Sequence, residues 1–209
     1  MRTQPRGLVA FDLDGTLLRG PTVCQLLATE IGRGEEMKAL ECLTSEAAVT
    51  EARLEMARWY DGIPRARLLA SLRQARWAPG AAEGVARLQR NGIEVVIASV
   101  TWHFAVAWMG EQLGISKCLG TRLSSNGRVG HVWPRDKGRW VRRLVSDLAV
   151  PPDRVGAVGD SDGDFELLGA ARVRIHVGAA LSPRWPEVIH VPDGDISSIA
   201  DRILELWAA

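Results

Sequence analysis

The fold that this sequence predicts is decided by the stretch LVAFDLDGT, residues 8–16. Its four apolar residues predict a short buried strand, which is followed by Asp12 and Asp14. Side chains two apart on an extended chain point the same way, so we expect both carboxylates at one edge of a sheet. Two like charges held together are costly unless a cation or a proton separates them. The pattern indicates chemistry in which one carboxylate attacks, the other handles a proton, and a hard divalent metal ion lies between them.

Three further motifs follow along the chain. An apolar run over residues 93–98 leads into Ser99, and Lys137 opens a helix-like stretch. A third apolar run over residues 155–158 leads into GDSDGD, residues 159–164. In open α/β sheets, ligands bind beyond the carboxyl ends of the strands. We therefore expect these motifs to meet the first one at a single site.

Composition narrows the class of protein. With 209 residues, 46% of them apolar, the chain can bury a substantial core as one domain with an insertion or as two small lobes. A net charge of +1 gives no electrostatic case for a nucleic-acid partner, and no long apolar segment predicts a signal or a membrane span. Three scattered cysteines favour a reducing compartment. We expect a cytoplasmic monomer or homodimer.

The apolar periodicity divides the chain into two kinds of segment. Residues 17–78 show helical spacing and no convincing strand, whereas strands alternate with helices from residue 79 onward. Asn126-Gly127 is a strong hairpin signal within the second part. Alternation of this kind predicts a three-layer α/β fold around a parallel sheet. The expected core comprises residues 1–16 and 79–209, with residues 17–78 inserted after the first strand.

Taken in order, the four motifs resemble those of the haloacid dehalogenase superfamily of phosphohydrolases, and the chain is similar to its phosphoserine phosphatase branch over nearly its whole length. The resemblance implies a Rossmann-like core with a small helical cap of type C1. It also implies a Mg²⁺-dependent phosphomonoesterase that hydrolyses a small phosphorylated metabolite through an aspartyl-phosphate. Two alternatives stay open: a phosphotransferase that uses an alcohol acceptor, and a catalytically idle binding protein on the same fold.

By this resemblance Asp12 is the nucleophile and Asp14 the general acid and base. A second Asp argues against dehalogenation, because dehalogenating members lack it. The implied metal ligands are Asp12, Asp14 through its backbone carbonyl, Asp160 and Asp164, the last acting through water or by holding a lysine. Oxygen ligands beside a phosphate favour Mg²⁺. A calcium-binding loop is excluded, because Phe165 stands where that loop requires glycine.

The implied phosphate-binding residues are Thr16, Ser99, Val100 and Lys137. Thr16 is expected to orient Asp12, or else to cap a helix. Lys137 would screen the charge of the phosphoryl group, although Arg135 or Arg139 could stand in its place. Trp102 and His103 are expected near the mouth of the site, with His103 either a second acid or base or a surface residue.

The resemblance weakens at the residues that read the substrate. Phosphoserine phosphatases carry a Glu five residues beyond the Thr of the first motif and an Arg in the cap. Here Pro21 occupies the first position, and Glu55 stands about where the Arg is expected, between Arg53 and Arg58. A missing partner for a buried substrate charge costs roughly 2–5 kcal/mol. The sequence therefore predicts a phosphatase that does not prefer phosphoserine, and leaves open whether Arg53 or Arg58 contacts the substrate.

Overall fold

The computed structural model describes residues 4–181, 185 and 187–208. In chain order the strands are β1 (Gly7–Phe11), β2 (Leu18–Arg19), β3 (Arg76–Trp77), β4 (Ile93–Trp102), β5 (Lys117–Leu123), β6 (Val129–Gly130), β7 (Val155–Gly159), β8 (Val173–Val177) and β9 (Ile189–Val191). The α-helices are α1 (Val23–Glu30), α2 (Gly34–Glu41), α3 (Glu46–Trp59), α4 (Arg65–Ser71), α5 (Ala81–Arg90), α6 (His103–Gln112), α7 (Pro134–Asp147), α8 (Phe165–Leu168) and α9 (Ile196–Ala208). Single turns of 3₁₀-helix are η1 (Leu72–Gln74), η2 (Pro152–Arg154) and η3 (Asp162–Asp164).

One sheet within the described residues runs in the order β6-β5-β4-β1-β7-β8-β9. Its pairings are parallel except that of β6, which returns antiparallel to β5 across the predicted hairpin turn. Strand β1 lies between β4 and β7 and is parallel to both, so the carboxyl ends of all three strands lie at the same edge of the sheet. The predicted α/β fold with a mostly parallel sheet is confirmed, and the motifs after these strands are brought to one edge.

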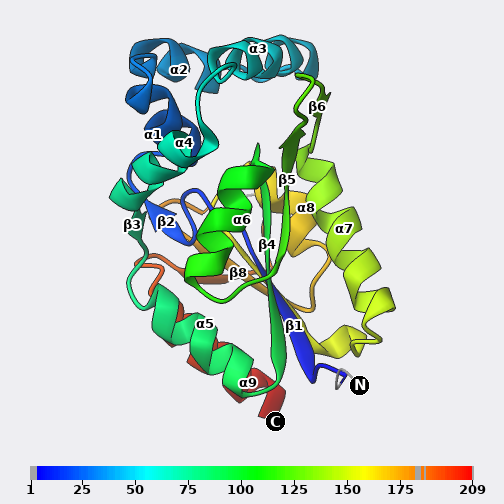
Figure 1. The fold of residues 1–209 in the computed structure, drawn as a ribbon. Coiled ribbons are helices and arrows are strands. Elements are labelled where there is room, and N and C mark those ends of the chain that lie inside the picture. Colours follow the sequence, from blue (N-terminus) through cyan, green and yellow to red (C-terminus); the bar gives the residue numbers. More distant parts are fainter. Residues whose placement is uncertain (1–3, 182–184, 186, 209) are drawn as a thin grey trace.

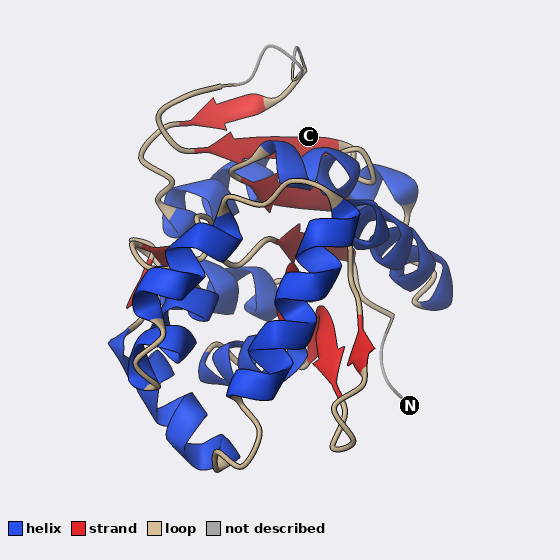
Figure 2. Cartoon of the chain, turned by 90° about the horizontal axis from the view of Figure 1, so that it is seen from above, coloured by secondary structure: helices blue, strands red, loops and turns tan. Residues whose placement is uncertain are grey.

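Helices cover both faces of the sheet, as the view from above shows (Figure 2). Val9 and Phe11 on β1 belong to a hydrophobic cluster shared with α5, α6 and α9, whereas Leu8 and Ala10 belong to a second cluster shared with α7 and α8. This alternation is the period of two expected of a strand that is buried on both faces. The result is three layers, with the apolar stretch that opens the sequence at the centre.

Helices α1 to α4 lie together beyond the carboxyl ends of the strands (Figure 1). We call residues 17–78 the helical insertion. Its apolar side chains, such as Leu27 and Met56, continue the larger of the two clusters. The expectation that this segment holds no strand was wrong: β2 pairs antiparallel with β3 where the chain leaves and re-enters the core. Two-residue strands are too short to show a periodicity in sequence.

Strand β4 is longer than the predicted residues 93–98 and runs on to Trp102. Its register with β5 shifts between Ala98 and Trp102, the part of the strand that contains Ser99. Bulges re-aim side chains next to functional sites. Ser99 therefore lies within an irregular strand rather than after its end. In the described part of the chain, no helix is both long and apolar enough to cross a membrane.

Candidate active site

Lys137 joins the first and fourth motifs. Its Nζ atom donates to Oδ1 of Asp12 at 2.6 Å and to Oδ1 of Asp164 at 2.7 Å. All three residues are buried, with exposed fractions of 4% for Lys137, 5% for Asp12 and 0% for Asp164. The alternatives at the third motif are excluded by position, because Arg135 pairs with Glu46 on the surface and Arg139 is exposed. Residues 125 positions apart in sequence thus meet at the carboxyl edge of the sheet.

The start of α7 explains how Lys137 reaches this point. Pro134 is the first helical residue, and Asp136 accepts a hydrogen bond from the backbone N–H of Trp133, so the helix begins just before the lysine. Gly138 lets α7 press against α8: a Cβ atom there would lie 2.0 Å from the carbonyl oxygen of Glu166. A glycine at this contact is what brings the lysine side chain down to Asp164.

The charges of this triad are coupled. Burial alone lowers the pKa of Lys137, but Asp12 and Asp164 outweigh it and hold that pKa above its usual value. Burial, reinforced by Asp164, raises the pKa of Asp12 well above its usual value, and Lys137 opposes this rise. A cation beside Asp12 is therefore needed to keep it ionised.

Asp160 completes an oxygen-rich group with Asp12 and Asp164. One carboxylate oxygen from each residue lies within 4.8 Å of the others. Gly15, with φ of +85°, passes so close that a Cβ atom would lie 2.2 Å from Oδ2 of Asp160. The hydroxyl of Thr16, which is buried, donates to Oδ1 of Asp160 at 3.1 Å. Thr16 thus orients the fourth motif, not Asp12 as we expected, because the chain has already turned past Asp12 at the glycine.

Asp164 is held by more donors than the other two carboxylates. Its Oδ1 accepts from Lys137, and its Oδ2 accepts from the backbone N–H groups of Asp160 and Ser161 and from the hydroxyl of Ser161. Asp12 and Asp160 are therefore the carboxylates best able to bind a cation, with Asp164 holding the lysine. Hard oxygen donors at this spacing fit a divalent metal ion.

The side chain of Asp14 does not join this oxygen group. Its Oδ1 accepts a hydrogen bond of 2.7 Å from the backbone N–H of Val23, the first residue of α1. Burial raises the pKa of Asp14 to about 6, although the hydrogen bond from Val23 and the charge of Lys137 oppose the shift. The two aspartates of the first motif thus have different environments, which suits different roles. A metal contact through the backbone carbonyl of Asp14 stays a prediction.

Ser99 and Val100 lie beside these carboxylates. Ser99 is buried, and its hydroxyl oxygen accepts a hydrogen bond from the backbone N–H of Thr101. The carbonyl oxygen of Val100 accepts from Arg53 of α3 at 3.1 Å, and the same Nη2 atom donates to the carbonyl of Val132 at 3.0 Å. The guanidinium of Arg53 also lies over the ring of Trp133, 4.8 Å from its centroid. Arg53 therefore ties the helical insertion to the segment after β4 and to the start of α7.

A cavity of about 530 Å³ lies between the sheet edge and the helical insertion. It is lined by residues of the four motifs and by side chains from α1, α2 and α3. The lining residues are Asp12, Asp14, Thr22, Cys24, Met37, Leu40, Glu41, Leu43, Val49, Ala52, Arg53, Met56, Ser99, Val100, Thr101, Pro134, Lys137, Ser161 and Gly163. The cavity therefore opens onto both Asp12 and Asp14 and can admit a small molecule to them.

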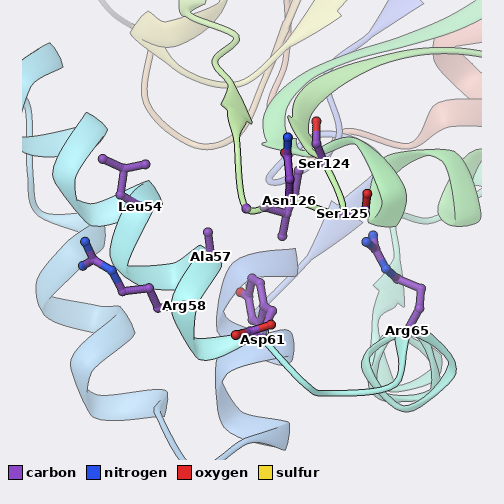
Figure 3. Close-up of a pocket in the computed structure, with 11 residues that line it drawn as sticks. Leu54, Ala57, Arg58, Asp61, Arg65, Ser124, Ser125 and Asn126 are labelled. Atoms are coloured by element: carbon purple, nitrogen blue, oxygen red, sulfur yellow. The ribbon is translucent and has the colours of Figure 1, made fainter.

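Arg58 does not line this cavity. It lines a separate one of about 610 Å³ between α3, the segment leading to α4 and the β5–β6 turn, with Arg65, Ser124 and Asn126 (Figure 3). Arg58 is exposed and pairs with Glu55. Of the two arginines left open by the sequence, Arg53 is the one at the aspartates.

Trp102 and His103 were expected near the mouth of the site, but neither is among the described residues that line the cavity. Trp102 is 1% exposed and packs edge-on against Tyr60 at 5.9 Å between ring centroids. His103 begins α6 and is not among the described residues that line the cavity at the aspartates. The extension of β4 carries Trp102 into the core, while His103 is half-buried at the start of α6, away from the cavity lining. Asp162, by contrast, is exposed.

Comparison with known protein families identifies the family of the chain that carries this site. Residues 9–169 match the family model described as haloacid dehalogenase-like hydrolase. The chain belongs to the haloacid dehalogenase-like hydrolase family. The match runs from β1 to the end of α8 and so contains all four motifs of this hydrolase.

Curated relatives of this hydrolase include phosphoserine phosphatases. That of Halobacterium salinarum is 28% identical over 180 residues, covering 81% of this chain and 85% of the relative. That of Campylobacter jejuni is 25% identical over 177 residues, covering 80% and 85%. A solved structure titled as a phospho-aspartyl intermediate analogue of phosphoserine phosphatase superposes with a TM-score of 0.77 at 21% identity, covering 95% of this chain and 99% of the other. This hydrolase therefore has the fold of a phosphoserine phosphatase.

Sequence reasoning missed several lining residues. Glu41 and Cys24 were not singled out, because neither belongs to a motif and both lie on helices predicted only as packing elements. One signal was available for Arg53: Ala52 and Met56 stand four apart on α3 and mark its buried face, on which Arg53 also lies. Burial raises the pKa of the Cys24 thiol to about 12, so this residue lines the cavity as a neutral group.

Proposed function

We propose that this protein is a Mg²⁺-dependent phosphomonoesterase that hydrolyses a small phosphorylated metabolite through a phosphorylated Asp12. The observation that carries the proposal is the buried lysine held between Asp12 and Asp164, with Asp160 alongside. A pure binding protein has no need of this complete set of residues, whereas a nucleophilic carboxylate needs a cation beside it. The likeness to proteins named phosphoserine phosphatases supports the same class of reaction.

In the first step an oxygen of Asp12 attacks the phosphorus atom and the bond from phosphorus to the ester oxygen breaks. The ammonium of Lys137, 2.6 Å from Asp12, reduces repulsion between the carboxylate and the phosphoryl oxygens. Ser99 and the backbone at Val100 line the same cavity and are proposed to hold those oxygens. Asp14 donates its proton to the departing alcohol oxygen.

In the second step Asp14, now ionised, accepts a proton from water. The resulting hydroxide attacks the phosphorus atom, the bond from phosphorus to Asp12 breaks, and inorganic phosphate leaves. A pKa of about 6 suits a group that must give up and regain a proton near neutral pH. The hydrogen bond from the backbone N–H of Val23 holds one oxygen of this carboxyl at the first turn of α1.

Asp12 and Asp160 are the proposed side-chain ligands of Mg²⁺, and Asp164 holds the lysine. When bound, the metal ion supplies positive charge that stabilises the transferring phosphoryl group. Thr16 fixes the direction of the Asp160 carboxylate and is proposed as a positioning residue.

We further propose that residues 17–78 form a cap domain on a core of residues 1–16 and 79–209. The cavity takes its lining from both parts, so a cap that moved away would open it. Arg53 and the surface pair of Glu46 with Arg135 link the two parts and would have to release for that motion.

Phosphoserine is not the proposed preferred substrate. Pro21 offers no charge for the amino group of a phosphorylated amino acid. Arg53 reaches the cavity, but one of its nitrogens already donates to two backbone carbonyls and its face is covered by Trp133. A substrate carboxylate would therefore have to compete with these contacts.

The test is phosphate release from 4-nitrophenyl phosphate and from a panel of metabolite phosphates that includes phosphoserine, with MgCl₂ and with EDTA. We expect turnover only with the metal ion, a loss of at least about a thousandfold in Asp12→Asn, and no preference for phosphoserine. Asp147→Asn, an exposed change at the end of α7, is the matched control and should behave as wild type. Wild-type turnover in Asp12→Asn would refute the nucleophile, and a strong preference for phosphoserine would refute the substrate proposal.

A further inference from the structure

Glu41, at the end of α2, is a carboxylate with a fixed direction. Thr22 donates its hydroxyl proton to Oε1 of Glu41 at 2.5 Å, and the side-chain amide of Gln25 donates to Oε2. The same two residues cap α1 reciprocally: the hydroxyl oxygen of Thr22 accepts from the backbone N–H of Gln25 at 3.1 Å, and Oε1 of Gln25 accepts from the backbone N–H of Thr22 at 3.2 Å. Each donor is thus held at both ends, and the carboxylate cannot turn freely.

This fixed carboxylate lines the same cavity as Asp12 and Asp14. The negative charge of Glu41 acts on groups in the cavity. Burial is the main reason that the pKa values of Asp14 and the Cys24 thiol are raised, and the charge of Glu41 adds to both shifts. The proposed chemistry assigns no role to Glu41. A carboxylate oxygen that accepts one hydrogen bond can still accept another, so Glu41 can bind a further donor that enters the cavity.

The rest of the lining contributed by α2, α3 and the segment joining them is mostly apolar. It consists of Met37, Leu40, Leu43, Val49, Ala52 and Met56. Apolar side chains of this kind favour a carbon chain over a hydroxyl-rich sugar. The positive group in this part of the cavity is Arg53, whose Nη2 atom already serves the carbonyls of Val100 and Val132. A leaving group would therefore meet apolar surface and one negative charge held in place.

We propose that Glu41 is a specificity-determining residue that binds a positively charged group on the leaving alcohol. The substrate class is a phosphate ester of an amino alcohol with a short apolar chain and no carboxylate. A negatively charged leaving group would be repelled by Glu41, and a neutral one would gain no attraction from its charge. This inference rests on the proposed function, because it concerns the alcohol side of the same reaction.

The test compares three esters that share a three-carbon chain and differ only in the group at its end: 3-aminopropyl phosphate, n-butyl phosphate and 4-phosphooxybutanoate. For the wild type we expect kcat/KM to fall in the order amine, methyl, carboxylate, with the amine ahead of the methyl by about tenfold, as a charged hydrogen bond is worth. In Glu41→Gln the ratio of amine to methyl should fall close to one. Glu55→Gln, which removes an exposed carboxylate of α3 outside this cavity, is the matched control and should keep the ratio.

Salt gives a second readout that needs no variant. Because the preference is electrostatic, the amine-to-methyl ratio of the wild type should shrink as ionic strength rises. Two results would overturn the assignment, provided that 4-nitrophenyl phosphate is still hydrolysed in an Asp12-dependent way. One is an amine-to-methyl ratio in the wild type that does not change with ionic strength, and the other is the wild-type ratio in folded Glu41→Gln. If neither 4-nitrophenyl phosphate nor any of the three alkyl esters is hydrolysed, the proposed function fails and this inference fails with it.

Discussion

Replacing Lys137 by methionine tests the electrostatic account of the site. Methionine keeps most of the apolar stem but removes the cation from between Asp12 and Asp164, both buried. Removing one partner of a buried ion pair costs about 3–5 kcal/mol, because the remaining charge is left without compensation. Since domains of this kind unfold at a cost of about 5–15 kcal/mol, the variant should lose a large part of its stability.

The assay is urea denaturation at pH 7.5 in EDTA, followed by the fluorescence of the eight tryptophans. Lys38→Met, which breaks the exposed pair with Glu35, is the matched control and should change the free energy of unfolding by no more than about 0.5 kcal/mol. The double variant Lys137→Met with Asp12→Asn removes one of the uncompensated charges. It should be more stable than the sum of the single changes predicts, by at least about 1 kcal/mol.

Two results would refute this reasoning. A cost for Lys137→Met no larger than that of Lys38→Met would mean that the lysine does not compensate buried charge. Strict additivity in the double variant would mean that Lys137 and Asp12 do not interact in solution.

Three further changes have defined outcomes. Burial raises the pKa of Asp14 to about 6 from a usual 3.8, so the folded chain binds this proton more tightly than the unfolded chain does. The free energy of unfolding in EDTA should therefore fall as pH rises between about 4 and 6. Urea titrations of Asp14→Asn should lack the contribution of Asp14 to this pH dependence. Gly15→Ala would place a Cβ atom 2.2 Å from Asp160 at a φ of +85°, so calorimetric titration should show Mg²⁺ affinity weakened by at least about tenfold; unchanged affinity would contradict the close approach. Arg53→Met removes a donor from the carbonyl of Val132 and one of two donors from the carbonyl of Val100, which keeps the hydroxyl of Thr121; it should lower the free energy of unfolding by about 1–3 kcal/mol, whereas Arg58→Met should not.

The parts of the fold that sequence could predict are those with a strong local pattern. The apolar runs that became β1, β4 and β7 each carry a polar motif at or near the end, and their convergence follows from the geometry of parallel strands. Asp12 and Asp160 were found in this way, whereas Lys137, on α7, was assigned through the resemblance of the third motif. The strands β2 and β3 were missed, because two residues are paired by the closing of the helical insertion and not by their own periodicity.

The parts that could not be predicted depend on how a side chain is aimed. Thr16 follows Asp12 closely in sequence, yet its hydroxyl reaches Asp160, because Gly15 turns the backbone between them. Arg53 and Arg58 lie on one helix, and only the packing of α3 against the core decides which enters the site. Glu41 has no motif at all and gains its direction from the capping residues of a neighbouring helix.

The reciprocal cap of α1 serves both the start of that helix and the direction of the Glu41 carboxylate. A new residue at Thr22 or Gln25 would alter both the initiation of a helix and the aim of a carboxylate toward incoming molecules. A substitution at Thr22 or Gln25 would therefore be expected to affect both folding and the choice of substrate. Substrate preference can change with less effect on folding through the apolar cavity residues of α2 and α3, because a substitution of similar volume there leaves the start of α1 intact.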